Sequence, residues 1–187
     1  MKKRDHIKMH SYPGMVAVVG VHTEEGANFM SAGWHAYLSM DPPMYGVAVG
    51  RERYTYDQLK KAGRFSINFL PFGQAEHIQY NGSLSGFQTD KGKTQKWFLT
   101  DSSVPMLEEA YLGYECELSS MVPTGDHDWV IGNIELCYYK EGLFGEDGLP
   151  DFSQVSIPLY LGRSTYMKLD DSVKKTQIHI PKDDKKS

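Results

Sequence analysis

The stretch Met15–Val21 (MVAVVGV) is a run of β-branched and small apolar residues that predicts a buried strand. A turn signal (TEEG, residues 23–26) ends this run, and Asn28–Trp34 (NFMSAGW) then predicts a second strand. Two strands joined by so short a turn form a hairpin. We therefore expect a β-sheet that begins with this hairpin.

The segments that follow continue the pattern of short strands. Strands are predicted at Met44–Val49, Phe65–Leu70, Tyr111–Val122, Trp129–Tyr139 and Pro158–Leu161, and helices at Tyr54–Ala62 and Gln74–Tyr80, with a helical turn at Met106–Ala110. The prolines of SMDPP (residues 39–43) are expected to break a strand, Asn81-Gly82 to end the second helix, and residues 82–96 to form a long loop. Short strands, few helices and no βαβ alternation predict a mainly β fold, either a barrel or a sandwich.

Length and composition limit the number of domains and the classes of protein to which the chain can belong. The chain has 187 residues, which predicts one domain, and its net charge of −4 argues against a nucleic-acid groove. The apolar run at residues 15–21 is too short to span a bilayer, and it follows a polar stretch unlike a signal peptide. Two cysteines, Cys116 and Cys137, do not make a disulfide framework, so we expect reduced thiols and a cytoplasmic protein. Residues 1–12 are expected to form a basic arm and residues 170–187 a charged tail.

Standard catalytic motifs are absent from the sequence. There is no GxGxxG and no Walker loop, and GSLSG (residues 82–86) has Leu84 where a nucleophile elbow needs serine. His6 and His10 have helical ligand spacing but no third ligand nearby, so no metal site is predicted. The aromatic share of 12% is high enough to suggest stacking on a planar ligand, although core packing explains most of it.

Two stretches favour a ligand with a planar part and a phosphate. In the second strand, small residues Ser31, Ala32 and Gly33 allow close approach to the backbone, with Trp34 beside them for stacking. At the start of the first helix, RERYT (residues 51–55) combines two arginines with a helix N-terminus, which suits phosphate. The alternatives are a packed strand with a core tryptophan and a capped helix with solvated arginines.

Two further stretches carry the same ambiguity. His127 follows a turn between two long strands and could reach a ligand at a barrel rim. Lys91, Lys93 and Lys96 in the long loop could neutralise a phosphate, although a solvated charge run is the plainer interpretation.

The order of these pieces resembles the flavin reductase-like family, and most of all its flavoredoxin-like branch. The resemblance spans about residues 13–166, within an expected domain of residues 13–169. It rests on NFMSAGW (28–34), SMDPP (39–43), RYTY (53–56), FSIN (65–68), Ser85-Gly86 with Asp90-Lys91, Glu115-Cys116, GDH (125–127) with Gly132, and PLYLG (158–162). This resemblance implies a split β-barrel of Greek-key type with a few short helices, which binds FMN. It also implies a homodimer with the flavin in a groove near the subunit interface.

Carried over by position, the resemblance implies a set of flavin contacts. The ring would be lined by Asn28, Ser31, Ala32, Gly33 and Trp34; the phosphate end would be held by Arg51, Arg53, Tyr54 and Thr55; and Lys91, His127 and Tyr160 would lie around the ligand. The chain departs from the family at FQT (residues 87–89), where many members carry arginine, and at Arg53-Tyr54, where many carry serine and arginine. Trp34 is expected to shape the ring environment, and His127 to contact the flavin or a nicotinamide.

Three functions remain open at this stage. The first is an NAD(P)H-dependent flavoprotein reductase that passes electrons to free flavin, ferric iron or a protein. The second is an electron carrier that takes electrons from a protein partner and lacks a nicotinamide site of its own. The third is a non-enzymatic barrel that binds flavin or another cofactor. No nicotinamide fingerprint is present, but a nicotinamide can stack on a bound flavin without one.

Overall fold

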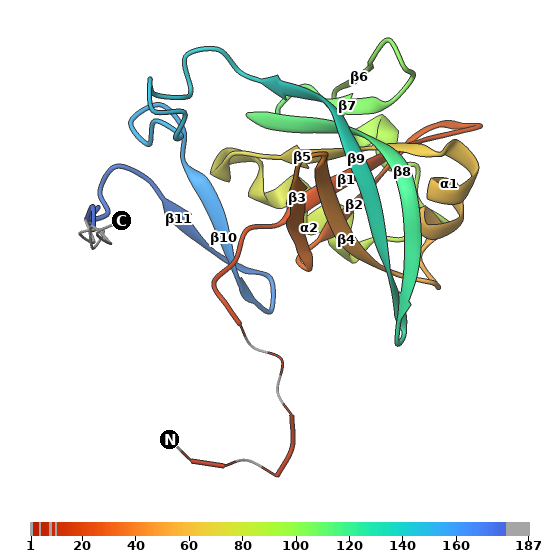
Figure 1. The fold of residues 1–187 in the computed structure, drawn as a ribbon, viewed down its shortest axis with the longest axis horizontal. Helices are drawn as coiled ribbons and strands as arrows, with labels where there is room; N and C mark the ends of the chain where they lie inside the picture. The colour runs from red at the N-terminus through yellow and green to blue at the C-terminus, as the bar shows by residue number, and fades with distance from the viewer. Residues whose placement is uncertain (1, 4, 8, 10, 179–187) are drawn as a thin grey trace, which may run out of the picture.

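A computed structural model gives the fold of residues 2–3, 5–7, 9 and 11–178 (Figure 1). The predicted N-terminal arm (residues 1–12) and charged tail (170–187) therefore lie partly outside the described residues, as does His10. Within the described part of the chain, no helix has the length and apolar character needed to cross a membrane. The same residues contain no group of three or more His, Cys, Asp or Glu side chains that could hold a metal ion.

The described residues fold mainly into β-strands, with two short α-helices. The strands are β1 (Ala17–Thr23), β2 (Gly26–Ala32), β3 (His35–Met40), β4 (Pro43–Gly50), β5 (Arg64–Phe69), β6 (Trp97–Leu99), β7 (Pro105–Leu107), β8 (Leu112–Thr124), β9 (His127–Tyr139), β10 (Ile157–Gly162) and β11 (Thr165–Leu169). The helices are α1 (Tyr54–Ala62) and α2 (Ala75–Ser83), with 3₁₀ turns at Phe72–Gln74 and Lys91–Thr94. A mainly β fold with few helices is thus confirmed.

Seven strands form one antiparallel sheet that curls into a barrel. Their order is β2-β1-β5-β8-β9-β4-β3, with the long β8–β9 hairpin crossing the front of the barrel in Figure 1. β2 runs through Gly33 and Trp34 directly into β3, so the two edges of the sheet are continuous in the chain. At this seam the backbone N–H of Ala48 donates a hydrogen bond to the carbonyl of Trp34 (2.9 Å). The sheet thus closes on itself through the continuous backbone of its two edge strands rather than through a ladder between them.

The apolar run that starts the fold is buried on both of its faces. Ala17, Val19 and Val21 point into the barrel core, whereas Val16 and Val18 pack in a second cluster outside it. That second cluster includes Ile78 of α2 and Leu107 of β7. A strand covered on both sides needs apolar residues at every position, which explains why this run does not alternate.

Two local predictions were wrong because tertiary contacts outweighed local signals. α2 continues through Asn81 and Gly82 to Ser83, because the buried Asn81 side chain exchanges two hydrogen bonds with Gln95 (2.8 and 2.9 Å). The predicted helical turn at Met106–Ala110 instead holds the last two residues of a strand, β7, and the turn that follows it. The Leu107 N–H donates to the Asn68 side chain (2.9 Å). The break expected at residues 39–43 is confirmed, because a tight turn there separates β3 from β4.

The last hairpin, β10–β11, stands to one side of the barrel (Figure 1). Tyr160 joins it to the N-terminal segment, because Tyr160 and Gly14 exchange backbone hydrogen bonds of 2.7 and 3.2 Å. The rings of Tyr160 and Tyr166 also pack against the outer apolar cluster that contains Ile78. This hairpin therefore reaches the same surface as α2 and the end of β2.

Candidate functional site

Asn28 and Thr55 bring β2 together with the start of α1. The Asn28 amide donates to the Thr55 hydroxyl (2.9 Å), and both residues are almost fully buried. The other polar atom of this side chain, Oδ1, is buried and has no hydrogen-bond partner among the described residues. A buried carbonyl left unpaired costs about 1–3 kcal/mol, so such an atom is expected to meet a donor from a bound molecule.

Gly86 brings the loop after α2 unusually close to this pair. A Cβ at this position would lie 2.4 Å from the Tyr54 ring and 2.6 Å from Asn28 Oδ1. Phe87 next to it packs edge-on against Tyr54, with ring centroids 5.1 Å apart. Together these residues border a cavity of about 230 Å³ whose lining also includes Asn28 and Lys91. The glycine thus lets backbone approach the site where a side chain would block it.

Lys91 is buried at the edge of this cavity, although its neighbours Lys93 and Lys96 face solvent. Its ammonium donates to the carbonyls of Phe29 (2.9 Å) and Asn81 (3.0 Å), and the residue is only 3% exposed. Burial, helped by the positive charge of Arg53, lowers the pKa of Lys91 to about 8. A buried cation held only by neutral carbonyls is a natural partner for an anionic ligand group.

The N-terminus of α1 adds a second source of positive potential. No side chain caps this helix, which begins after Arg53, and the Arg53 side chain is half exposed beside Glu52 (3.2 Å). Free backbone N–H groups at a helix start bind anions through the helix dipole. The α1 start and the charges of Arg53 and Lys91 thus lie close enough to act on one another, which suits an anionic group such as a phosphate.

Arg51 is engaged differently from the prediction that placed it on the phosphate end. Its guanidinium contacts Asp128 Oδ1 through Nε (2.7 Å) and Nη2 (2.6 Å), while the Tyr56 hydroxyl donates to Asp128 Oδ2 (2.5 Å). The hydrogen bond from Tyr56 and the charge of Arg51 lower the pKa of Asp128. Asp128 thus ties the start of β9 to the turn before α1. Asp128 was not among the residues expected at the site, because its only signal in the sequence is its place directly after His127.

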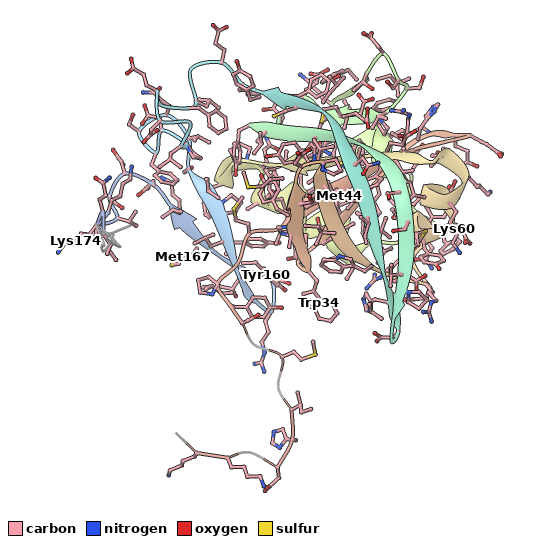
Figure 2. All side chains as sticks on the ribbon, in the orientation of Figure 1. Trp34, Met44, Lys60, Tyr160, Met167 and Lys174 are labelled. Carbon is pink, nitrogen blue, oxygen red and sulfur yellow. The ribbon has the colours of Figure 1, made fainter. Side chains whose placement is uncertain are left out.

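Trp34 and His127 meet at the rim of the barrel. Their ring centroids are 5.1 Å apart with 50° between the planes, and Trp34 is 46% exposed. Figure 2 shows Trp34 projecting from the lower end of the barrel. His127 lies opposite Gly50 in the β4–β9 ladder, and its Nδ1 contacts Asp126 (2.8 Å). These two rings form an exposed aromatic wall close to the turn that carries Arg51.

Ser31, Gly33 and Tyr160 border a separate, smaller cavity of about 160 Å³, together with Gln79, Gly82 and Tyr166. The Ser31 hydroxyl donates to the Ile78 carbonyl (2.6 Å), and the space beside Gly33 is open. Ala32 differs from the expectation, because its side chain belongs to the barrel core. Ala32 can therefore contribute only its backbone to a ligand site.

The predicted contacts consequently fall into two groups rather than one. Side chains alternate along β2, so Asn28 and Ser31 lie on opposite faces of that strand. The chain from α2 to Lys91 borders both cavities, through Gly82 on one side and Gly86 on the other. An extended ligand with a planar end and an anionic end, such as FMN, fits this arrangement. Its phosphate would suit the basic group at α1, and its ring would suit the surface near Gly33 and Trp34.

Comparisons with known proteins give a family match and several similar structures. The family model described as "Flavin reductase like domain" matches residues 9–170. An FMN-binding protein from Thermus thermophilus, crystallised with 1-cyclohex-2-enone, is 38% identical, with a TM-score of 0.85 over 94% of this chain and 99% of that one. A flavoredoxin from Methanosarcina acetivorans is 26% identical, with a TM-score of 0.83 over 94% of this chain and 95% of that one.

A curated relative adds a protein whose printed name states an activity. The NADH-dependent flavin reductase StyB from Pseudomonas fluorescens is 28% identical over 65% of this chain and 69% of its own length. The similarity to the two solved structures, together with the closed sheet, confirms the split β-barrel that the sequence predicted.

Proposed function

The chain belongs to the flavin reductase-like domain family, and from this membership we propose that it is an FMN-binding oxidoreductase that accepts electrons from NAD(P)H. The observation that carries the proposal is the unpaired, buried Asn28 Oδ1 next to an uncapped helix start and the buried Lys91. The FMN-binding relative from Thermus thermophilus and the NADH-dependent reductase support the same function.

The residues of the chain would bind and orient the flavin rather than react with it. Arg53, Lys91, Thr55 and the first N–H groups of α1 would hold the phosphate, with Tyr54 against Phe87 beside it. Asn28 Oδ1 would accept a hydrogen bond from the ligand, and the Asp128–Arg51 pair would fix the turn that carries these groups. When bound, FMN supplies the redox chemistry, accepting a hydride and passing electrons on.

The ring end of the ligand would lie along the end of β2. Ser31, the backbone of Ala32, and Gly33 would line it, while Trp34 and Tyr160 would flank it. Trp34 and His127 together would exclude water from one side of the ring and leave a flat surface for a nicotinamide. No nucleophile is needed for this reaction, in keeping with a sequence that carries no nucleophile motif.

The visible spectrum of the purified protein is the first test. Bound FMN gives a yellow protein, and anaerobic addition of NADH or NADPH is expected to bleach it. Riboflavin, which lacks the phosphate, is expected to bind less tightly than FMN, because Arg53 and Lys91 would have no anion to contact. A colourless protein that also fails to take up added FMN would contradict the proposal and favour a barrel that binds another cofactor.

The second candidate is an electron carrier without a nicotinamide site. The flavoredoxin from Methanosarcina acetivorans, which is similar over 94% of this chain, favours the electron-carrier hypothesis. In that case NADH and NADPH would both leave the bound flavin oxidised, whereas a chemical reductant would bleach it. Electrons would then come from a protein partner.

We also propose that the working unit is a homodimer built from residues 13–169 and located in the cytoplasm. Large apolar side chains are exposed on β3 and β9, namely Leu38, Met40 and Leu136. Surface of this kind is commonly covered by a second copy in a two-fold interface. Light scattering at micromolar concentration is expected to give twice the monomer mass, and Leu136→Asp is expected to lower it. The free thiols Cys116 and Cys137 suit a reducing compartment.

A further inference from the structure

A large cavity lies away from the flavin contacts proposed above. It has a volume of about 920 Å³ and opens at one mouth of the barrel. The starts of β3 and β8 and the ends of β5 and β9 form its inner wall, and the segment before β10 forms its outer wall. It shares no lining residue with the cavities beside Asn28 and Ser31. Barrel mouths of this size are common ligand sites.

The walls of this barrel-mouth pocket are aromatic and uncharged. Tyr37 and Tyr45 pack edge to face with centroids 5.0 Å apart, and Tyr111 lies 6.3 Å from Phe144. None of the described residues that line it is an acid, a lysine or an arginine. His35 is the one side chain in this lining that could gain a positive charge near neutral pH, and burial lowers its pKa, which favours the neutral ring. The pocket therefore disfavours charged ligands, including phosphates and carboxylates.

The two hydrogen-bond partners of His35 determine which of its ring nitrogens carries the proton. Its Nε2 faces the Met15 carbonyl (3.1 Å), which can only accept, so Nε2 must carry the proton. Its Nδ1 is then an acceptor and takes the hydroxyl proton of Tyr45 (2.6 Å). His35 and Tyr45 thus have no proton left to offer a ligand.

Tyr37 and Tyr114 are arranged differently. Their hydroxyl groups are hydrogen-bonded to each other. Such a pair holds two protons but uses only one in its mutual bond, and no other described residue accepts the second. The pair therefore presents one hydroxyl proton on the wall of an otherwise apolar pocket.

We propose that the barrel-mouth pocket binds an uncharged, planar aromatic compound that carries one oxygen acceptor, either a phenol or an aromatic carbonyl. The aromatic walls take the ring, and the Tyr37–Tyr114 pair donates its free proton to the oxygen. His35, which lines the pocket, is the first residue of β3 and directly follows Trp34 at the barrel seam. This site does not depend on flavin binding.

Fluorescence titration with 2-naphthol tests the proposal, with naphthalene and 2-naphthoate as comparison compounds. We expect saturable binding of one 2-naphthol per chain, with or without FMN. Naphthalene lacks the oxygen and is expected to bind roughly five- to tenfold more weakly, as for one net hydrogen bond. The charged 2-naphthoate is expected not to bind.

Variants of the tyrosine pair give a sharper result. Tyr37→Phe alone leaves the Tyr114 proton free, and Tyr114→Phe alone leaves that of Tyr37, so each single variant keeps near wild-type affinity. The double variant loses the donor, and 2-naphthol should then bind no better than naphthalene. Cys137→Trp fills the pocket and should abolish binding. Tyr138→Phe, on the neighbouring position of β9 but outside the lining, is the matched control and should leave affinity unchanged.

Three outcomes would overturn the proposal. One is an absence of saturable 2-naphthol binding by wild-type protein that takes up FMN normally, which would leave the flavin function intact. Another is equal loss of binding in the double variant and in Tyr138→Phe. The third is a wild-type dimer that does not bind 2-naphthol and that Cys137→Trp splits into monomers, which would show that a second copy covers the pocket.

Discussion

The indole of Trp34 stacks at a tilt on the imidazole of His127, with 5.1 Å between the ring centroids. Trp34 follows β2 at the barrel seam, whereas His127 begins β9 on the opposite edge of β4. The contact therefore spans the rim of the barrel and joins two stretches that the sequence analysis could only consider separately.

Replacing Trp34 is expected to weaken FMN binding. Trp34→Ala removes the exposed ring of this wall, and loss of one aromatic contact corresponds to about 1 kcal/mol, or roughly fivefold in the dissociation constant. His127→Ala is expected to have a smaller effect on affinity and a larger one on the rate of reduction by NAD(P)H. Flavin titration and anaerobic stopped-flow absorbance measure the two quantities. Unchanged values in both variants would remove these residues from the site.

Substitution of Gly86 is expected to damage the phosphate end without unfolding the protein. In Gly86→Ala the new methyl group would collide with Tyr54 and Asn28 Oδ1, at 2.4 and 2.6 Å. Forced overpacking of this kind costs about 1–3 kcal/mol, and much of it should appear as weaker FMN binding. Gly73→Ala is the matched control, because nothing lies within 4 Å of its Cβ position. Equal FMN affinity in the two variants would contradict the close approach at residue 86.

Lys91 is expected to make stability depend on pH in the alkaline range. Its pKa is about 8 in the fold and near its ordinary value of 10.5 in the unfolded chain. Between these values the unfolded chain binds more protons, so the free energy of unfolding contributed by this group rises with pH. The difference in unfolding free energy between wild type and Lys91→Met, measured by urea denaturation from about pH 8 to about pH 10, should show this slope.

Bound FMN provides a check on that measurement. A phosphate beside Lys91 would favour the protonated amine, so saturating FMN should flatten the difference between the two proteins over the same pH range. An identical slope with and without FMN would place the phosphate away from Lys91.

Loss of the Asp128 carboxylate is expected to loosen the turn before α1. Asp128→Asn removes the charge that Arg51 and Tyr56 contact, so the melting temperature at neutral pH should fall. Because the folded pKa of Asp128 is lowered, its stabilising effect is present above the ordinary pKa and disappears as the pH falls through the folded value. Thermal scans should therefore show the two proteins converging in strong acid. A constant difference at every pH would contradict this assignment.

Much of the fold could be predicted because its signals are local. The apolar run at residues 15–21, the turn that follows it and the long strands β8 and β9 all have clear patterns. β3 was missed because most of its side chains are exposed and it precedes a proline-rich turn. α2 was cut short because the contact between Asn81 and Gln95 is invisible in the sequence.

The site was less predictable, since its key features depend on distant contacts. Lys91 looked like part of a solvated run with Lys93 and Lys96, yet it alone of the three is buried. Arg51 looked like a phosphate ligand, and only the fold shows Asp128 against it. The residue types in the sequence indicated which side chains could bind a phosphate. The contact that each side chain makes could be identified only from the folded barrel.

The Ala48 amide proton, hydrogen-bonded to the Trp34 carbonyl, reports whether the strands at the barrel seam are paired. Exchange of that amide with deuterated solvent requires the seam to open, and opening moves the residue that carries the indole. A ligand bound against Trp34 should raise the free energy of opening the seam. Deuterium uptake at the Ala48 amide should therefore slow by the corresponding factor. The exchange rate of the Ala48 amide, measured by NMR or mass spectrometry, therefore reports ligand binding at the barrel rim.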